Sequence, residues 1–220
     1  MNIATKLFNL KGSIPDHVEL VAVSKTKPAS MILEAYNEGH RIFGENRAQE
    51  LASKYEELPK DIEWHFIGHL QTKKVKYIAG FVALIHAIDS LKLLHTVDKE
   101  AKKHDRIIDC LLQIHIAREE TKFGFDTEEV LELLTSGTTA ELTNINIKGL
   151  MGMATFTEDN TIIENEFSGL KNVFDQVKSV KAENFEPSIL SMGMSGDYNI
   201  AIEMGSNMIR VGSIIFGERS

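Results

Sequence analysis

The sequence predicts an α/β protein with the (β/α)8 TIM barrel fold, in which helices surround one closed parallel sheet. Apolar runs typical of buried strands alternate about eight times with segments whose apolar residues have helical spacing. No polar linker, low-complexity tract or block of like charge interrupts this alternation. At 220 residues the chain is long enough for one buried core, so we expect a single domain over residues 1–220. The alternative is an open doubly wound sheet, which needs fewer strands or an additional edge.

The first expected strand ends in a lysine. Four apolar residues over 20–23 lead into Ser24 and Lys25, and Pro28 then stops the strand and suits the first turn of a helix. That helix covers 29–37 and is ended by a glycine. Ligands and chemistry collect at the carboxyl ends of strands in parallel α/β folds, which makes Lys25 a candidate functional residue. A lysine in such a place can also be an ordinary charged residue.

The same alternation continues along the chain. Strand 41–45 is followed by Asn46, which can cap a helix, and by a segment to Tyr55 that is rich in good helix formers. Strand 64–68 precedes a short basic helix over 71–79. The later elements are strand 81–88, helix 91–104 with Ser90 as its cap, strand 106–116, helix 129–134 with Thr127 as its cap, strand 145–154, a helix from Thr157 or Asn160 to 177, strand 188–192, helix 198–204 ended by Gly205, and strand 208–211. The helix to 177 has apolar residues close to a 3.6-residue period, which predicts one buried face.

Composition narrows the possible partners and the compartment. The net charge of −8 argues against general affinity for nucleic acid, although it leaves a local basic patch open. No apolar stretch approaches the length of a membrane span. The one cysteine, Cys110, cannot form an internal disulfide and lies in an apolar run, so we expect an inert core residue. We therefore expect a soluble, cytoplasmic protein.

Two turns near the end of the chain could hold a phosphate group. In (β/α)8 barrels the loops after strands seven and eight often form such a site from backbone amides and a short helix N-terminus. The segment 191–197 carries glycines and Ser195, and Gly212 and Ser213 form a second Gly-Ser turn. Each turn alone is weak support, because most Gly-Ser turns are only turns. The other expected strand ends bring Glu45, Asn46, Gly68, His69, Asp89, Ser90, Met153 and Ala154 to the same mouth.

Arg210 lies inside the last apolar strand, and we expect it to point into the centre of the mouth. Its guanidinium group remains charged and only donates hydrogen bonds, so it needs an acceptor. A ring nitrogen of a ligand is one option. A structural salt bridge to Glu45, Asp89 or Glu203 is an equally good alternative.

Other motifs give little support to other chemistry. His65 and His69 lack the helical spacing and the acidic partner of a metal site, so we expect no bound metal. His86 and His115 lie within apolar strands, where packed and hydrogen-bonded histidines are the more common case. Dinucleotide-binding, P-loop and serine-hydrolase motifs are absent from the sequence.

Six segments, in order along nearly the whole chain, resemble the YggS/PROSC family of pyridoxal 5′-phosphate (PLP) homeostasis proteins. These segments are 21–28, 43–50, 64–71, 149–154, 191–195 and 210–217. The resemblance implies a barrel like the N-terminal domain of alanine racemase. The family has a longer segment before the first strand and usually asparagine and threonine where this chain has Lys73 and Ser213. We therefore expect an abbreviated first helix, while Ser213 keeps the hydroxyl and the amide.

The resemblance also implies how the vitamin B6 cofactor PLP is held. Lys25 forms a Schiff base with it, Ser195 with the turn at Gly212 and Ser213 holds its phosphate, and Arg210 faces its pyridine nitrogen. The remaining expected cofactor-binding residues are Asn46, His69 and Met192. If Arg210 donates to the pyridine nitrogen, that nitrogen stays unprotonated, and the ring is then a poor electron sink. For Lys25 to react, burial or a nearby cation must lower the pKa of its amine, which is a hypothesis at this point.

Three functions remain open from the sequence. The resemblance favours a non-catalytic carrier that buffers PLP and supplies it to apo-enzymes, without catalytic residues of its own. An amino-acid racemase or lyase that uses PLP, or an aldolase without a cofactor, is the alternative. Alanine racemase requires a tyrosine base from an additional domain, whereas we expect none of Tyr36, Tyr55, Tyr77 and Tyr198 to be so placed. The third option is a phosphate-ligand module in which Lys25 is only a positive contact. We expect a monomer.

Overall fold

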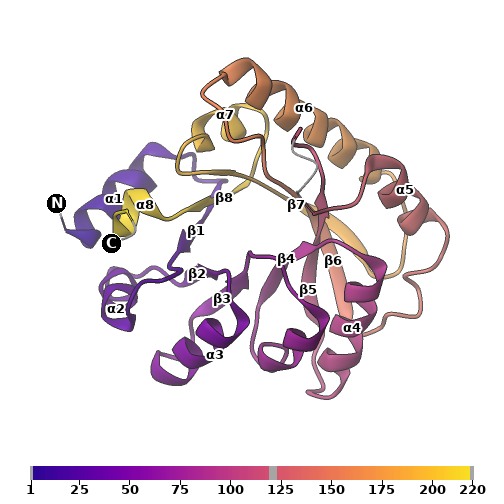
Figure 1. Ribbon diagram of the computed structural model, residues 1–220, viewed down its shortest axis with the longest axis horizontal. Coiled ribbons are helices and arrows are strands. Elements are labelled where there is room, and N and C mark those ends of the chain that lie inside the picture. Colours follow the sequence, from indigo (N-terminus) through magenta and orange to yellow (C-terminus); the bar gives the residue numbers. More distant parts are fainter. Residues whose placement is uncertain (1, 119–122, 219–220) are drawn as a thin grey trace.

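The eight strands form one closed parallel barrel, in which each strand pairs with the next in sequence and β8 returns to β1 (Figure 1). The computed structural model describes residues 2–118 and 123–218. The strands are β1 (Glu19–Val23), β2 (Ile42–Glu45), β3 (Glu63–Phe66), β4 (Leu84–Ile88), β5 (Ile108–Ile114), β6 (Ile145–Gly152), β7 (Phe185–Met194) and β8 (Met208–Val211). The predicted barrel is thereby confirmed, and the open doubly wound sheet is excluded.

The helices lie on the outside of this sheet (Figure 1). They are α1 (Ile3–Ser13), α2 (Ala29–Asn37), α3 (Ala48–Glu57), the 3₁₀ helix η1 (Thr72–Tyr77), α4 (Leu91–Lys102), α5 (Thr127–Thr135), α6 (Asn160–Val177), α7 (Tyr198–Glu203) and α8 (Ser213–Phe216). The first and last of them, α1 and α8, pack against each other, so the two described ends of the chain lie side by side. Within residues 2–118 and 123–218, no helix combines the length and the apolar character that a membrane crossing requires.

Several expected boundaries are corrected by the structure. The first helix, α1, has 11 residues and is capped by the side chain of Asn2. Asp126, rather than Thr127, caps α5 and forms a capping box with Glu129. The segment expected as a helix over 71–79 is a 3₁₀ helix, and β7 extends beyond the expected 188–192 at both ends.

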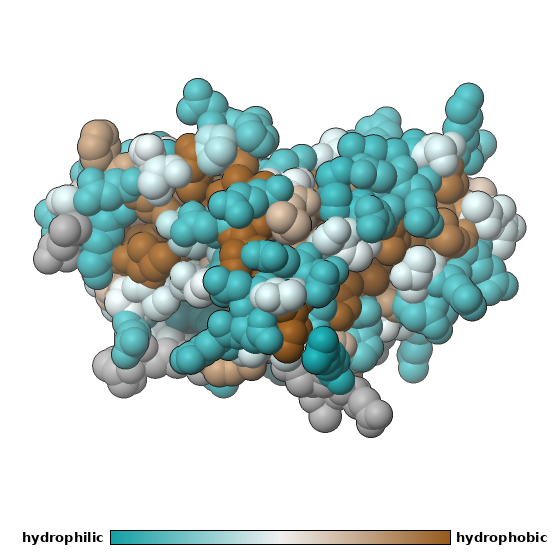
Figure 2. Space-filling model, turned by 90° about the horizontal axis from the view of Figure 1, so that it is seen from above, coloured by the Kyte–Doolittle hydropathy of each residue, from teal (hydrophilic) through white to brown (hydrophobic). Residues whose placement is uncertain are grey.

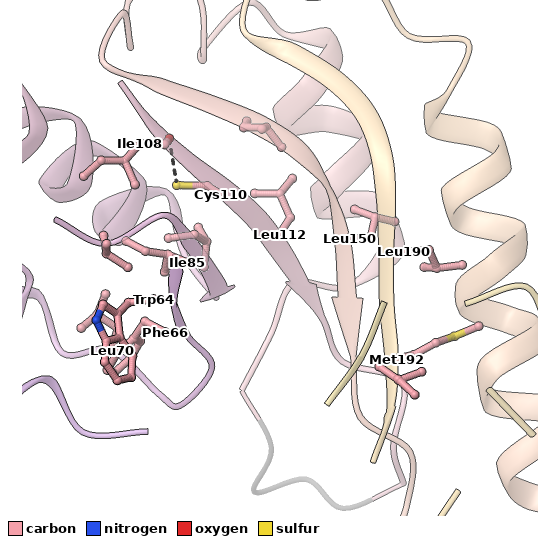
Figure 3. Packing of buried hydrophobic residues seen from close by; sticks show 14 of the residues in the cluster. Trp64, Phe66, Leu70, Ile85, Ile108, Cys110, Leu112, Leu150, Leu190 and Met192 are labelled. Carbon is pink, nitrogen blue, oxygen red and sulfur yellow. Dashed lines mark hydrogen bonds between the residues drawn. The ribbon is translucent and has the colours of Figure 1, made fainter. Parts of the chain in front are cut away.

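The core has two parts because successive strand residues face opposite sides of the sheet. The larger part packs strand residues against the helices. Figure 3 shows this layer around Trp64, Phe66, Cys110, Leu112 and Met192. The smaller cluster consists of strand residues alone and fills the barrel interior, as expected for this fold. Its members are Val21, Leu84, Ala87, Leu111, Met151 and Met208.

The outer surface is mostly hydrophilic on the face seen in Figure 2, where apolar side chains show between charged and polar ones. Buried polar side chains also lie on the strands beside members of the apolar cluster. Four of them are buried on the strands that surround one mouth: His65, His86, Ser191 and Arg210. The barrel interior therefore holds a group of buried polar side chains beside its apolar cluster.

Candidate functional site

A pocket of about 640 Å3 opens at the carboxyl ends of the strands. This volume lies in the range of small-molecule and cofactor sites. Six of the eight expected cofactor-binding residues line it: Lys25, Asn46, Ser195, Arg210, Gly212 and Ser213. The topology explains the assembly, because every parallel strand delivers its last residues to the same mouth.

Lys25 follows β1 in a tight, well-held turn. The amide of Ser24 continues the sheet by donating to the carbonyl of Gly44 (3.0 Å), and the amide of Lys27 closes the turn on the carbonyl of Ser24 (3.0 Å). Thr26 lies in the left-handed region with φ of 65°, which is unusual for a β-branched residue. The side chain of Lys25 is half-buried and lines the pocket.

The loops after β7 and β8 come together through Ser195. Its hydroxyl oxygen accepts a hydrogen bond from the amide of Gly212 (3.2 Å), and the side chain of Asp197 accepts one from the amide of Met194 (2.5 Å). Glycine is needed at position 193, where φ is 95° and an added Cβ would lie 2.6 Å from Cβ of Ala201. Residues 213–216 form α8 rather than a simple turn, so Ser213 contributes a first-turn amide that has no acceptor within the helix.

Arg210 lies in the barrel interior, where it hydrogen-bonds to neutral groups. Its Nη1 donates to Oγ of Ser191 (2.6 Å) and its Nη2 to the carbonyl of Gly152 (3.0 Å). Burial lowers the pKa of Arg210 to about 10, against the opposite influence of Asp197, and the group still carries its charge at neutral pH. Of the acidic residues proposed as its partners, Glu45 pairs with Lys54 and Asp89 with His69.

Two histidines continue the hydrogen-bonded chain that begins with Arg210 and Ser191. Nδ1 of His86 lies 3.1 Å from Oγ of Ser191, and Nε2 of His86 lies 3.0 Å from Nδ1 of His65. Burial lowers the pKa of His65 to about 3 and that of His86 well below its ordinary value, so both rings are neutral. The hydrogen-bonded core histidine expected at position 86 is thus confirmed. Half-buried His115 lies just beyond the end of β5 rather than within it.

Asn46 also belongs to the pocket rather than to a helix cap. The N-cap of α3 is Arg47, and no side chain caps it. Among the described residues, Oδ1 of Asn46 is buried without a hydrogen-bond partner. Gly68 packs against this residue so closely that an added Cβ would lie 2.5 Å from the carbonyl oxygen of Asn46.

His69 and Met192 lie outside the residues that line the pocket. Nδ1 of His69 is 2.9 Å from Oδ2 of Asp89, and its ring stacks on Phe123 with centroids 4.0 Å apart. The side chain of His69 is 41% exposed. Met192 is fully buried in the layer between sheet and helices, where Figure 3 shows it near Leu190. The sequence places His69 at the mouth by its position after an expected strand, whereas Met192 follows only from the motif around it.

Next to the Lys25 turn lies a charged cluster that the sequence did not indicate, formed by Glu45, Glu50 and Lys54. Lys54 lies within hydrogen-bond distance of Glu45 and Glu50, at 2.6 and 2.8 Å from Nζ to each Oε1. Oε2 of Glu45 is buried without a partner in the described part of the chain, and burial raises the pKa of this carboxyl group. Burial acts in the same direction on Glu50, but its bonds to Lys54 and to the Thr26 amide lower its pKa overall. The only available signal was the i, i+4 spacing of Glu50 and Lys54, which is also typical of an exposed helix face.

The closed parallel barrel, with Lys25 after β1 and Arg210 on β8 facing one pocket, defines the class of alanine racemase-type barrels. Residues 2–220 match the family described as alanine racemase, N-terminal domain, and the chain belongs to this family. A pyridoxal phosphate homeostasis protein of Aquifex aeolicus is 41% identical over 202 residues, covering 91% of this chain and 87% of that protein. These relatives confirm the resemblance that the six segments indicated.

A solved structure of PipY from Synechococcus elongatus without PLP matches with a TM-score of 0.92 and 33% identity, covering 98% of this chain and 100% of that one. The same protein with PLP bound matches with a TM-score of 0.88 over the same shares of both chains. Both comparisons concern a relative of nearly equal length, so the barrel of this chain corresponds to the whole of that protein.

Proposed function

We propose that this protein binds PLP through Lys25 and acts in PLP homeostasis, as a carrier that buffers the cofactor and supplies it to apo-enzymes. The observation that carries the proposal is the meeting of Lys25, Ser195 and Arg210 in one pocket. The relatives named pyridoxal phosphate homeostasis protein and the PLP-bound structure of PipY support it. PLP supplies an electrophilic aldehyde and a visible chromophore.

The residues of the pocket fit the chemical groups of PLP. Lys25 supplies the amine that condenses with the aldehyde to a Schiff base, with release of one water molecule. The hydroxyl of Ser195 and the first-turn amide of Ser213 suit a phosphate group. Arg210 would donate to the pyridine nitrogen, and the buried Oδ1 of Asn46 needs a donor that the described residues do not provide.

The same geometry favours a carrier over an enzyme. A permanently donating Arg210 keeps a ring nitrogen unprotonated, which weakens the ring as an electron sink for carbanion chemistry. Its partners Ser191 and Gly152 supply no carboxylate that would reverse this effect. We therefore propose that racemisation is not the function, and that α-proton exchange of alanine in deuterated water does not exceed the rate with free PLP.

The experiment that tests PLP binding is an absorption spectrum in the near-ultraviolet and visible range, before and after added PLP and borohydride. We expect a visible band in the wild type, with the reduced adduct mapped to Lys25, and no band in Lys25→Ala. The matched control is Lys27→Ala, because Lys27 lines the same pocket but donates to the carbonyl of Glu218 (2.8 Å). A wild type without a band in excess PLP would overturn the proposal.

The carrier role has a separate test. Protein loaded with PLP should restore the activity of an apo-aminotransferase, and the reduced adduct should not, because reduction fixes the cofactor to Lys25. We further propose that residues 1–220 act as one domain and as a monomer, which sedimentation velocity checks. An adduct that restores activity after reduction would show that the enzyme obtained free PLP from another source.

A further inference from the structure

The backbone on both sides of Lys25 is held by two side chains of one outer helix. Oε1 of Glu50 accepts a hydrogen bond from the amide of Thr26 (2.6 Å), and Nζ of Lys54 donates to the carbonyl of Ser24 (2.9 Å). Both side chains come from α3, one turn apart. They therefore hold the residue before Lys25 and the residue after it from the same rigid element.

The turn needs such support because Thr26 is in an unfavourable conformation. Its φ of 65° brings a β-branched side chain into the left-handed region, which L-residues avoid. Strained residues of this kind persist only where their surroundings fix them. The bond from the Thr26 amide to the Glu50 carboxylate is charge-assisted, and bonds of this type are the stronger class.

Glu50 and Lys54, which we call the clamp, are connected to the barrel by a buried carboxylate. Glu45, fully buried at the end of β2, lies 2.6 Å from Nζ of Lys54 and accepts a hydrogen bond from Oγ of Ser24 at the same distance. The side chains of Lys54 and Glu50 are 9% and 22% exposed. Water and salt therefore weaken these contacts less than they weaken a surface ion pair.

None of the three side chains lines the pocket within the described part of the chain. They are not placed to bind a ligand in the pocket, whereas Ser195 and Arg210, which line it, are. Glu50 and Lys54 act on the pocket through the turn that carries Lys25, because both are hydrogen-bonded to its backbone. Binding of the phosphate and ring of PLP therefore depends on other residues than the reaction of the Lys25 amine does.

We propose that Glu50 and Lys54 are positioning residues that fix Lys25 for reaction with the aldehyde of PLP, an inference that rests on the proposed function. In that reaction the Lys25 amine adds to the aldehyde carbon, a C=N bond forms, and the carbonyl oxygen leaves as water. A turn held on both sides keeps the amine oriented toward the pocket, which raises its effective concentration at the aldehyde. Loss of the clamp reduces Schiff-base formation and spares the binding of the phosphate and ring.

The test compares two ligands on the same variants. PLP reports binding together with Schiff-base formation through its visible band, and pyridoxine 5′-phosphate, which carries an alcohol in place of the aldehyde, reports binding alone. We expect Glu50→Ala to weaken apparent PLP affinity about tenfold and to leave pyridoxine 5′-phosphate affinity within about twofold. Glu57→Ala is the matched control, because Glu57 is an exposed carboxylate in the last turn of the same helix.

The conservative variant Glu50→Gln separates positioning from folding. Its amide oxygen can still accept from Thr26 without the charge, so we expect a loss of PLP affinity smaller than in Glu50→Ala, with unchanged pyridoxine 5′-phosphate binding. If Glu50→Ala does not fold, this variant carries the comparison. Equal losses for both ligands, or no loss for PLP, would overturn the inference while a visible band in the wild type upholds the proposed function. A wild type without the band overturns both.

Discussion

Nη1 of Arg210 donates to Oγ of Ser191 over 2.6 Å in the interior of the barrel. Since a guanidinium group can only donate, the hydroxyl proton of Ser191 is directed to Nδ1 of His86, and the Nε2 proton of His86 to Nδ1 of His65. Two neutral histidines and one hydroxyl thus fix the direction of a buried cation through hydrogen bonds between neutral groups. This arrangement fixes the position of the Arg210 guanidinium group in the barrel interior.

The variant Ser191→Ala tests that arrangement. It leaves Nη1 of Arg210 and Nδ1 of His86 without their partner in a buried place, so we expect a loss of about 1–3 kcal/mol in the free energy of unfolding. We also expect PLP affinity to fall, because Arg210 is then less firmly aimed. Urea unfolding and ligand titration measure the two effects. Ser188→Ala, an exposed position on the same strand, should change neither.

The packing of Gly68 against Asn46 gives a second prediction. A Cβ at position 68 would lie 2.5 Å from the carbonyl oxygen and 2.8 Å from Cα of Asn46, and backbone atoms yield little. We expect Gly68→Ala to cost roughly 1–3 kcal/mol of stability and to weaken PLP binding by displacing Asn46. Calorimetry and ligand titration check this expectation.

The control for that variant is another glycine. Gly169 lies exposed within α6, and nothing approaches an added Cβ there within 4 Å. Gly169→Ala should therefore stabilise the protein by about 0.5–1 kcal/mol through its better helix propensity. Equal behaviour of the two variants would contradict the close contact at Gly68.

The sequence was informative where one residue's place in a strand decides its role. Lys25 and Arg210 could be assigned to the mouth because each adjoins or lies within a short apolar run in an alternating chain, and closure of the barrel then brings them together. The clamp of Glu50 and Lys54 could not be predicted this way. It depends on how α3 rotates against the turn after β1, and charged residues at i, i+4 look the same on any exposed helix.

The differences between expected and observed element boundaries also have local causes. Helix α8 has four residues, too few to show a period, so the sequence predicts only a turn there. Asn46 is a favourable helix cap by type, but Arg47 is the N-cap of α3, and Asn46 lines the pocket instead. Residue type predicted a polar role there and tertiary structure decided which one.

Cys110 provides a third prediction. Its side chain is fully buried in the layer shown in Figure 3, and burial raises the pKa of the thiol above its ordinary value. The thiolate is the reactive form, so the native protein should not react with Ellman's reagent on the timescale of minutes. The unfolded protein should release one equivalent of thiolate, since the chain has one cysteine. Rapid reaction of the native protein would mean that β5 opens locally.

Buried neutral histidines should make the protein sensitive to mild acid. Burial, together with the charges of Lys11 and Arg41, lowers the pKa of His40 from 6.5 to about 4, and its Nε2 lies 2.8 Å from the carbonyl oxygen of Ile42. Because the native pKa is below the unfolded value, the unfolded chain binds more protons as the pH falls below about 6.5. The stability contributed by neutral His40 is thus fully present above that pH and is lost toward pH 4.

The variant His40→Gln isolates this contribution. Urea unfolding between neutral pH and about pH 5 should show a free energy that declines less steeply than in the wild type, by up to about 1.4 kcal/mol per pH unit. The slope is the quantity to compare, because the substitution also removes the edge contact of His40 with Phe43 and so lowers stability at every pH. His95→Gln, on the exposed side of α4, should keep the wild-type slope. Equal slopes in His40→Gln and the wild type would show that the native state protonates His40 as readily as the unfolded chain does.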